Sequence, residues 1–210
     1  MPINRSLPLK SIWDPVPVPD RVHETVTEAR ACTLCAPLLP LGPKPILQVS
    51  ASAKLLIIGQ APGTKAHLSG VPWNDQSGKR LREWIGLNDD QFYDDRLVAI
   101  VPASLCYPGA SKTGGDNPPM PACAPLWHPR IIPQLSQVRL TLLVGLHAQK
   151  LFLGNRPMAE NVQVGSTDPR YFPLPHPGWR VTTWMQRNSW FETDVLPRLR
   201  LRLENAIMAN

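Results

Sequence analysis

The fold of this chain is decided by the stretch Leu55-Leu56-Ile57-Ile58-Gly59-Gln60-Ala61-Pro62-Gly63. Its first four residues form an apolar run, which is typical of a central parallel strand that is buried on both faces. The glycines and the proline that follow favour a tight turn, where the backbone can approach a ligand closely. The stretch therefore predicts a buried strand that ends in a candidate ligand-binding turn.

Apolar runs and helical patterns alternate along the rest of the chain. Four strands are predicted, at residues 54–59, 96–101, 139–145 and 171–174. Helices are predicted at residues 21–32, 78–85, 130–138, 147–153 and from residue 189 onward, and a Gly- and Pro-rich loop at residues 107–125. This order predicts an α/β fold of three layers, α/β/α, with a central four-stranded parallel sheet. Ligands of such sheets bind at the carboxyl ends of the strands.

Two helix starts carry the signature of a capping box. Asn88 is followed by Gln91, and Ser189 is followed by Glu192, so that each pair predicts reciprocal side-chain caps. Pro197 is expected to disturb the second of these helices slightly. The buried stripe predicted for that helix consists of Phe191, Val195, Leu199, Leu203 and Ile207.

The composition fits one domain with a polyanionic partner. The chain has 210 residues, a formal net charge of +6 and a pI of about 9.4. We expect residues 21–210 to form a single domain, preceded by an extended Pro-rich arm at residues 1–20. The positive net charge favours nucleic acid as the partner, although a basic protein without a nucleic-acid role could have the same net charge.

The chain also lacks the signals of membrane and secreted proteins. No apolar run approaches the roughly 20 residues that span a bilayer. The first residues carry no apolar signal-peptide region. We therefore expect a cytoplasmic protein that makes no membrane contact, and separately we expect it to be a monomer.

A second chemical signal is the Pro-rich segment 173–179, which carries His176-Pro177 directly after the fourth predicted strand. In order and spacing, the chain resembles the uracil-DNA glycosylase superfamily over residues 28–207. Residues 59–63, with 70–73 and 75–78 after them, resemble its motif A, and His176-Pro177, with 188–191 after it, resembles motif B of the bacterial four-cysteine members (the family 4 and family 5 types). The resemblance implies the uracil-DNA glycosylase fold. It also implies a monofunctional hydrolase of base-excision repair, which cleaves the N-glycosidic bond of uracil or other deaminated bases in DNA and leaves an abasic site.

The resemblance implies a catalytic set of Asp75, His176 and Gln60. Bond cleavage leaves a base anion and a cationic sugar, so the reaction needs a donor near the base oxygen, which suits His176, and a carboxylate. Branches of the family carry an acid at the position of Ala61 or Gln60, which leaves Asp75 as the surviving candidate. Gln60 is then expected to orient the water or the base. Asp75 could instead serve only to cap the helix that begins near Ser77.

The base-binding residues that the resemblance implies are Gly59, Ala61, Pro62, Gly63, His67, Trp73, Asn74 and Ser77. Trp73 stands where the family stacks an aromatic ring on uracil, and the alternative is an ordinary core residue. Asn74 could read a pyrimidine edge or serve a turn. The Asn with which the family reads uracil is not evident at residues 101–104, which puts strict uracil specificity in question.

The DNA-binding residues that the resemblance implies are Lys65, Pro177, Gly178, Trp179 and Arg180. In the family, the motif-B loop enters the minor groove of DNA. Trp179 could wedge into the stack that the flipped base vacates, with Arg180 on a phosphate. Trp179 could equally pack on its own helix.

Four cysteines offer a candidate metal site: Cys32, Cys35, Cys106 and Cys123. A set of four thiolates suits zinc or an iron–sulfur cluster on chemistry alone. Free thiols are a further alternative, because only the first pair has tight ligand spacing. The resemblance to the four-cysteine glycosylases implies a structural [4Fe–4S] cluster that ties the N-terminal helix to residues 106–123.

Two other classes of function compete with the enzyme. A catalytically weak or inactive relative could act as a binding module for damaged or single-stranded DNA, and the missing motif-A carboxylate favours it. An unrelated α/β hydrolase would need a nucleophile, and the chain has no Gly-x-Ser-x-Gly elbow. Release of uracil from DNA would distinguish the enzyme from the binding module.

Overall fold

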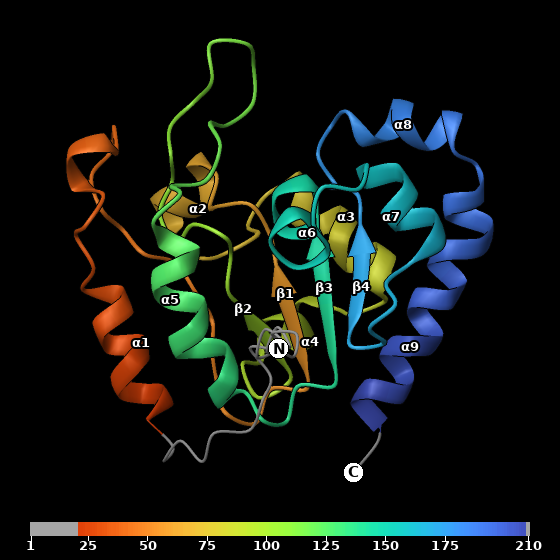
Figure 1. The fold of residues 1–210 in the computed structure, drawn as a ribbon, viewed down its shortest axis with the longest axis horizontal. Helices are drawn as coiled ribbons and strands as arrows, with labels where there is room; N and C mark the ends of the chain where they lie inside the picture. The colour runs from red at the N-terminus through yellow and green to blue at the C-terminus, as the bar shows by residue number, and fades with distance from the viewer. Residues whose placement is uncertain (1–20, 209–210) are drawn as a thin grey trace, which may run out of the picture.

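A computed structural model describes residues 21–208 of the chain, so the arm predicted at residues 1–20 lies outside the described residues. Its centre is a parallel sheet in the order β2-β1-β3-β4 (Figure 1). The strands are β1 (Leu55–Ile58), β2 (Val98–Ile100), β3 (Leu140–Val144) and β4 (Tyr171–Leu174). The predicted four-stranded parallel sheet is confirmed.

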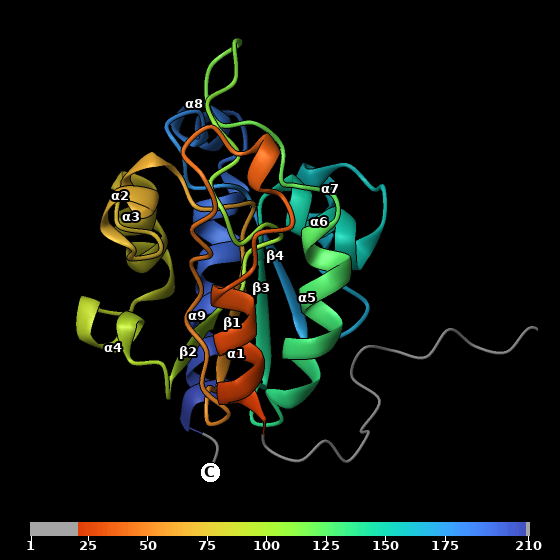
Figure 2. The same cartoon turned by 90° about the vertical axis from the view of Figure 1, so that its left-hand side faces the viewer.

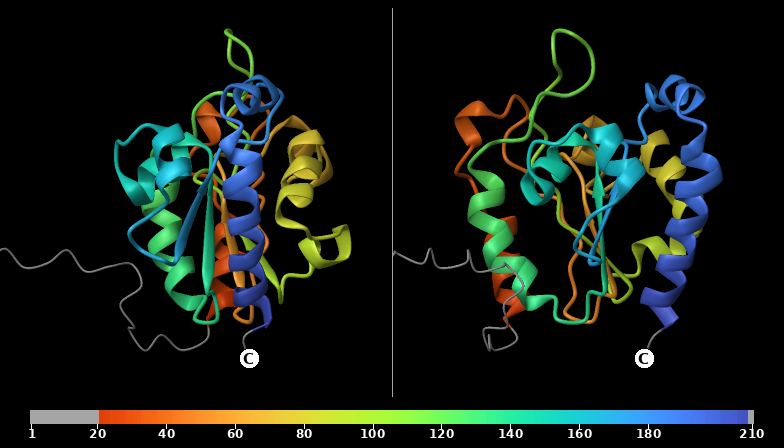
Figure 3. Two further views of the ribbon diagram at one scale, coloured as in Figure 1. Left: turned by 90° about the vertical axis from the view of Figure 1, so that its right-hand side faces the viewer. Right: turned by 45° about the vertical axis from the view of Figure 1, so that its right-hand side comes forward.

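Helices cover both faces of the sheet (Figures 2 and 3). One face packs against α3 (Gln76–Ile85), α4 (Asp89–Tyr93) and α9 (Leu196–Met208). The other face packs against α1 (Val22–Arg30), α5 (Cys123–Ile131) and α6 (Leu146–Leu153). Successive side chains of β1 enter the two cores in turn, and none of them is exposed, which is why the strand is apolar throughout. The three-layer prediction is therefore confirmed.

Three short helices lie near the carboxyl ends of the strands and were not predicted. They are α2 (Thr64–Ser69), α7 (Met158–Val164) and α8 (Val181–Arg187) (Figure 1). Of these, α2 follows the turn after β1, and α8 follows the loop that carries His176. Short helices give few periods of an apolar pattern, so the sequence signal for them is weak.

The prediction of a helix at residues 130–138 is wrong. The regular helix is α5, which begins at Cys123 and ends at Ile131, followed by the 3-10 turn η2 (Ile132–Gln134). Pro125 lies in the first turn of α5, where its missing N–H has no helical partner and costs nothing. Pro-rich composition therefore hid a helix at the end of the predicted loop 107–125.

One predicted capping box is confirmed and the other is wrong. Asn88 and Gln91 make both reciprocal hydrogen bonds at the start of α4. At the C-terminal helix, no side chain caps the start, and Ser189 contributes its backbone carbonyl, which accepts from Glu192 N–H. The helix opens with a π turn, η3 (Phe191–Val195), and continues as α9, whose second residue is Pro197.

The predicted stripe of that helix faces the core as expected, since Phe191, Val195, Leu199 and Leu203 are almost fully buried and Ile207 is half-buried. No helix within residues 21–208 has the length and apolar character needed to cross a bilayer.

Candidate active site

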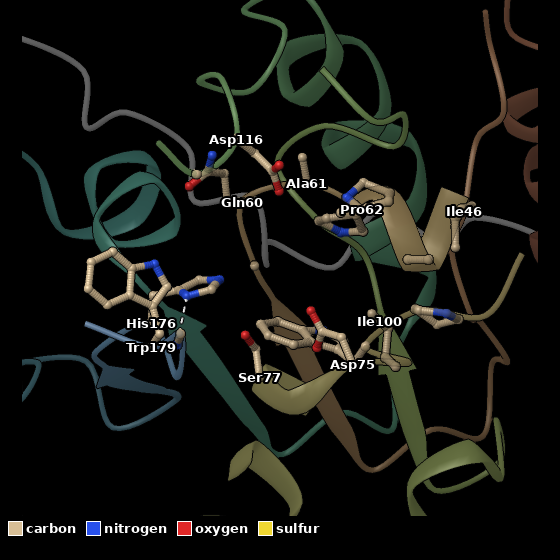
Figure 4. A pocket seen from close by; sticks show the side chains of 18 of the residues that line it. Ile46, Gln60, Ala61, Pro62, Asp75, Ser77, Ile100, Asp116, His176 and Trp179 are labelled. Carbon is tan, nitrogen blue, oxygen red and sulfur yellow. Dashed lines mark hydrogen bonds between the residues drawn. The ribbon is translucent and has the colours of Figure 1, made fainter. Parts of the chain in front are cut away.

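A cavity of about 420 Å³ opens at the carboxyl ends of β1, β2 and β4 (Figure 4). All three residues of the predicted catalytic set, Asp75, His176 and Gln60, line it. They come from the loop before α3, the loop after β4 and the turn after β1, so residues more than a hundred positions apart meet at one edge of the sheet.

Most of the predicted base-binding residues also line this cavity. Those that line it are Gly59, Ala61, Pro62, Gly63, Trp73 and Ser77. His67 and Asn74 do not: His67, on α2, is buried with its ring 6.1 Å from that of Tyr107. The structure therefore brings the motif-A turn together with Trp73 and leaves His67 outside.

Asp75 lines the cavity and also caps α3. Its Oδ1 atom accepts a hydrogen bond of 2.8 Å from the Gly78 N–H, and its backbone has the extended conformation of an N-cap. A carboxylate in this position is favoured by the unpaired N–H groups and the dipole of the helix. The capping role and the cavity role are thus met by the same side chain.

The side chain of His176 is held in one tautomer by its own loop. Its Nδ1 atom accepts a hydrogen bond of 3.1 Å from the Gly178 N–H, so the proton of the neutral ring is on Nε2. Surrounding protein atoms lower the pKa of His176, against the opposing charge of Asp75, although solvent still reaches the ring. The cavity therefore contains a neutral imidazole whose free N–H can donate.

Two glycines make room for this imidazole. A Cβ on Gly145 would lie 3.2 Å from the Cβ atom of His176, and one on Gly178 would lie 3.0 Å from Nδ1. Trp73 lies on a third side, with its ring centroid 5.8 Å from that of His176 and the planes tilted by 32°. These three residues flank the imidazole, while the rest of the His176 side chain stays exposed at the cavity.

Trp73 has a strained backbone, with φ of 56°, which a bulky residue rarely adopts. Its ring lies so close to Gly59 that an added Cβ there would be 2.8 Å from the ring atom Cζ2. Its carbonyl oxygen lies only 1.7 Å from the position of a Cβ on Gly78. Both glycines are therefore required for the ring to lie over the turn and line the cavity, while it also packs on the core beneath.

Arg80, on α3, supports the His176 loop, although no sequence motif pointed to it. Its Nη1 atom donates to the carbonyl oxygens of Pro177, at 3.0 Å, and Gly178, at 2.9 Å. A single Arg on a helix is usually solvated, and no local pattern marks this one. Its partners lie almost a hundred residues away, so only the tertiary structure reveals the role.

Asp116 is the second functional candidate that the sequence analysis missed. It lines the cavity from the loop between β2 and α5, on the side of Gln60 and Ala61 and across from Asp75 (Figure 4). Burial raises the pKa of Asp116, and the nearby negative charge of Asp75 adds to this effect. The residue lies in the Gly- and Pro-rich segment, where no motif pointed to it.

The predicted DNA-binding residues lie at and around the mouth of the cavity. Gly178, Trp179 and Arg180 line it, whereas Lys65, on α2, and Pro177 do not. The Trp179 side chain is 74% exposed, so the alternative of packing on its own helix is not met. The Arg180 guanidinium stacks 4.6 Å from the centre of the Trp179 ring, which presents both groups to solvent together.

The four cysteines gather around a separate small cavity of about 20 Å³. Cys32 and Cys35 follow α1, Cys106 follows β2, and Cys123 begins α5. Burial raises the pKa of the Cys106 thiol to about 11, and the Leu105 N–H donates to the Cys123 sulfur at 3.3 Å. Within residues 21–208, no three such side chains converge as closely as the ligands of a single metal ion.

Comparison with known protein families adds an independent line of support for this site. Residues 47–200, more than half of the chain, match the uracil DNA glycosylase superfamily. The matched region contains the whole sheet and every residue that lines the cavity except Ile46. The chain therefore belongs to the uracil DNA glycosylase superfamily, which supports a glycosylase-type activity on DNA in general terms.

Proposed function

We propose that the protein excises uracil, and other deaminated bases, from DNA by hydrolysing the N-glycosidic bond, as a cytoplasmic monomer. The observation that carries this proposal is the single cavity in which His176, Asp75 and Trp73 meet. A base-excising enzyme must rotate its target nucleotide out of the stack and bind the base in a pocket. The cavity has the size and the groups for this task.

In the proposed reaction, His176 stabilises the leaving base. As the glycosidic bond breaks, negative charge develops on the base oxygen, and a neutral imidazole can donate its Nε2–H to that oxygen. The hydrogen bond from Gly178 to Nδ1 orients the ring and determines which nitrogen carries the proton. A group held in advance in this way contributes its electrostatic effect without reorganisation.

Trp73 and Asp75 would act on the two ends of the bond that breaks. The Trp73 ring lies beside His176 and offers an aromatic face for the base. One Asp75 oxygen is bound to the helix N-terminus, and the other remains available to stabilise the positive charge that develops on the sugar. This arrangement agrees with the loss of the acid from the motif-A turn, where Gln60 and Ala61 stand.

The decisive experiment is a glycosylase assay on a panel of single- and double-stranded oligonucleotides. Each carries one uracil, hypoxanthine or xanthine, and abasic sites are detected by alkaline cleavage. A panel is needed because Pro102 and its neighbours, Val101 to Ser104, offer no Asn to read uracil. We expect cleavage of at least the uracil substrate, and folded protein that cleaves no substrate would refute the proposal.

Variants then test the two residues that carry the chemistry. His176→Ala and Asp75→Ala are each expected to lower the rate by about 10²–10³-fold, the range for losing one electrostatic or acid–base contribution. Asp75→Ser is the matched variant, because Ser also caps helices and removes only the carboxylate. Full activity of Asp75→Ser would show that capping is the whole role of Asp75.

A binding-only function is the second candidate. Gln60 favours it, since its amide replaces an acid and its Nε2 atom donates to the Asn117 carbonyl, at 2.9 Å. Tight binding of uracil-containing or abasic DNA without any base release, measured by fluorescence anisotropy and the same cleavage assay, would select this candidate.

We also propose that the four cysteines hold a structural [4Fe–4S] cluster. The thiols line one cavity, and the Leu105 N–H that donates to the Cys123 sulfur is the kind of hydrogen bond that tunes the potential of an iron–sulfur cluster. A cluster distributes its four ligands over four irons, which suits cysteines that surround a space better than a single zinc ion does. When bound, the cluster would link the segment after α1 to the start of α5.

Purified protein tests this proposal through its colour and its iron and sulfide content. Cys32→Ser and Cys123→Ser are each expected to lose the visible absorbance and to lower the thermal stability. Colourless protein that contains zinc, or no metal at all, would refute the cluster.

A further inference from the structure

The loop between β2 and α5 brings one carboxylate, that of Asp116, into the cavity. The loop projects from the edge of the sheet and folds back as a hairpin (Figure 1). Its base is held by a bridge between Ala110 and Asp116 and by the Asn117 N–H, which donates to the Gly109 carbonyl at 2.8 Å. The position of Asp116 is therefore set by backbone pairing.

This loop is joined directly to the turn after β1. The Gln60 side chain donates to the Asn117 carbonyl, one residue from Asp116. A Cβ on Gly63 would lie 3.4 Å from the Oδ2 atom of Asp116, so the carboxylate stands against the glycine face of the turn. The turn has no acid of its own, and Asp116 lies beside the place where one would be.

The Asp116 carboxylate has no partner in the described part of the chain. No donor within residues 21–208 binds either oxygen of Asp116. Loss of solvent around the carboxyl group and the negative charge of Asp75 both raise the pKa of Asp116. The Asp116 side chain is exposed where it lines the cavity, and a carboxylate in a cleft with a perturbed pKa is a candidate functional group. Its free oxygens face a cavity with space for water and a nucleotide.

We propose that Asp116 is the catalytic residue that binds and orients the attacking water. This inference rests on the proposed glycosylase function. The C–N bond breaks and its electron pair leaves with the base, while the water oxygen bonds to the sugar carbon. One water proton passes to the Asp116 carboxylate and then to solvent, and the base anion takes up a proton from solvent. Asp75 then stabilises the positive charge on the sugar, and His176 donates a hydrogen bond to the leaving base.

The pH dependence follows from this role. Asp116 must be ionised to accept the proton, and its pKa is raised above that of an ordinary carboxyl. The rate should therefore be lost as the pH falls through this raised pKa, and Asp116→Asn should remove that part of the acid limb. His176 and Asp75, which share the cavity, are unchanged in this variant.

The test uses single-turnover cleavage of a uracil-containing single-stranded oligonucleotide by the full chain, from pH 4.5 to 8. The variants are Asp116→Asn, Asp116→Ser as a second replacement, and Asp95→Asn as an exposed control carboxylate outside the cavity. Affinity for the same oligonucleotide is measured by anisotropy, and folding by circular dichroism.

We expect both Asp116 variants to lose about 10²-fold in rate. Affinity should remain within about threefold, the acid limb should shift or vanish, and Asp95→Asn should match the wild type. Asp116 variants that keep the wild-type rate and acid limb would overturn the inference and leave the proposed function standing. A fall in rate that only follows lost affinity would overturn it as well. Wild-type protein that cleaves no base refutes the proposed function, and this inference with it.

Discussion

Gly178→Ala is the sharpest probe of the imidazole that we place at the leaving base. Gly178 does not use the left-handed backbone region, so alanine is compatible with its conformation, and the N–H that donates to His176 is kept. The new methyl group would lie 3.0 Å from Nδ1 and 3.4 Å from Cε1 of His176. The change therefore moves the ring without removing any group from it.

The size of the effect follows from these distances. Carbon and neighbouring heavy atoms pack at about 3.5–4.0 Å, so the ring must shift by about 0.5 Å. Misplacement by about 1 Å can cost about 10²-fold in rate, so we expect about a 10-fold loss in the single-turnover rate. The free energy of unfolding should change little, because the loop is partly exposed.

A double-mutant cycle with His176→Ala shows whether the methyl group acts through the imidazole. In the His176→Ala background the space beside Gly178 is empty, so the second change should have almost no effect on the residual rate. A 10-fold loss in both backgrounds, or no loss in either, would refute the placement of His176 as the oriented donor.

Three other perturbations give separate tests. Gly78→Ala is expected to lower the free energy of unfolding in urea by about 3 kcal/mol, because its Cβ would lie 1.7 Å from the carbonyl oxygen of Trp73; a loss below about 1 kcal/mol would contradict this packing. Trp179→Ala should weaken binding of single-stranded DNA about 10-fold in anisotropy titrations and leave the melting temperature unchanged, since the ring is exposed and available for stacking. Burial lowers the pKa of His128, so the unfolded chain binds the proton more strongly, and stability should fall as the pH drops below about 6.5. His128→Asn should reduce that slope, and an unchanged slope would exclude this source.

Much of the scaffold was predictable because its signals are local. The apolar runs of β1 and β3 have to be buried on both faces, and alternation with helices leaves a parallel sheet as the arrangement that does this. The capping box at Asn88 was readable for the same reason, since both partners lie within one turn. The Ser189 box was wrong because the helix opens with a π turn whose N-cap position is Trp190, and the start of α5 was missed because its Pro125 suits a first helical turn.

Some residues of the site could likewise be predicted from the sequence, and others could not. The turn at Gly59 and the loop at His176 each follow a strand, so the sequence was enough to predict that they meet at the carboxyl edge of one parallel sheet. Most of the predicted base-binding residues line the cavity there, but His67 and Asn74 do not. Arg80 and Asp116 came only from the tertiary structure, because neither belongs to a local pattern. Arg80 acts on carbonyls almost a hundred residues away, and a hairpin base carries Asp116 to the turn after β1. The pattern of apolar residues along the chain determines which surfaces must be buried. The partner of a single charged side chain is determined only by folding, which brings a distant backbone segment next to it.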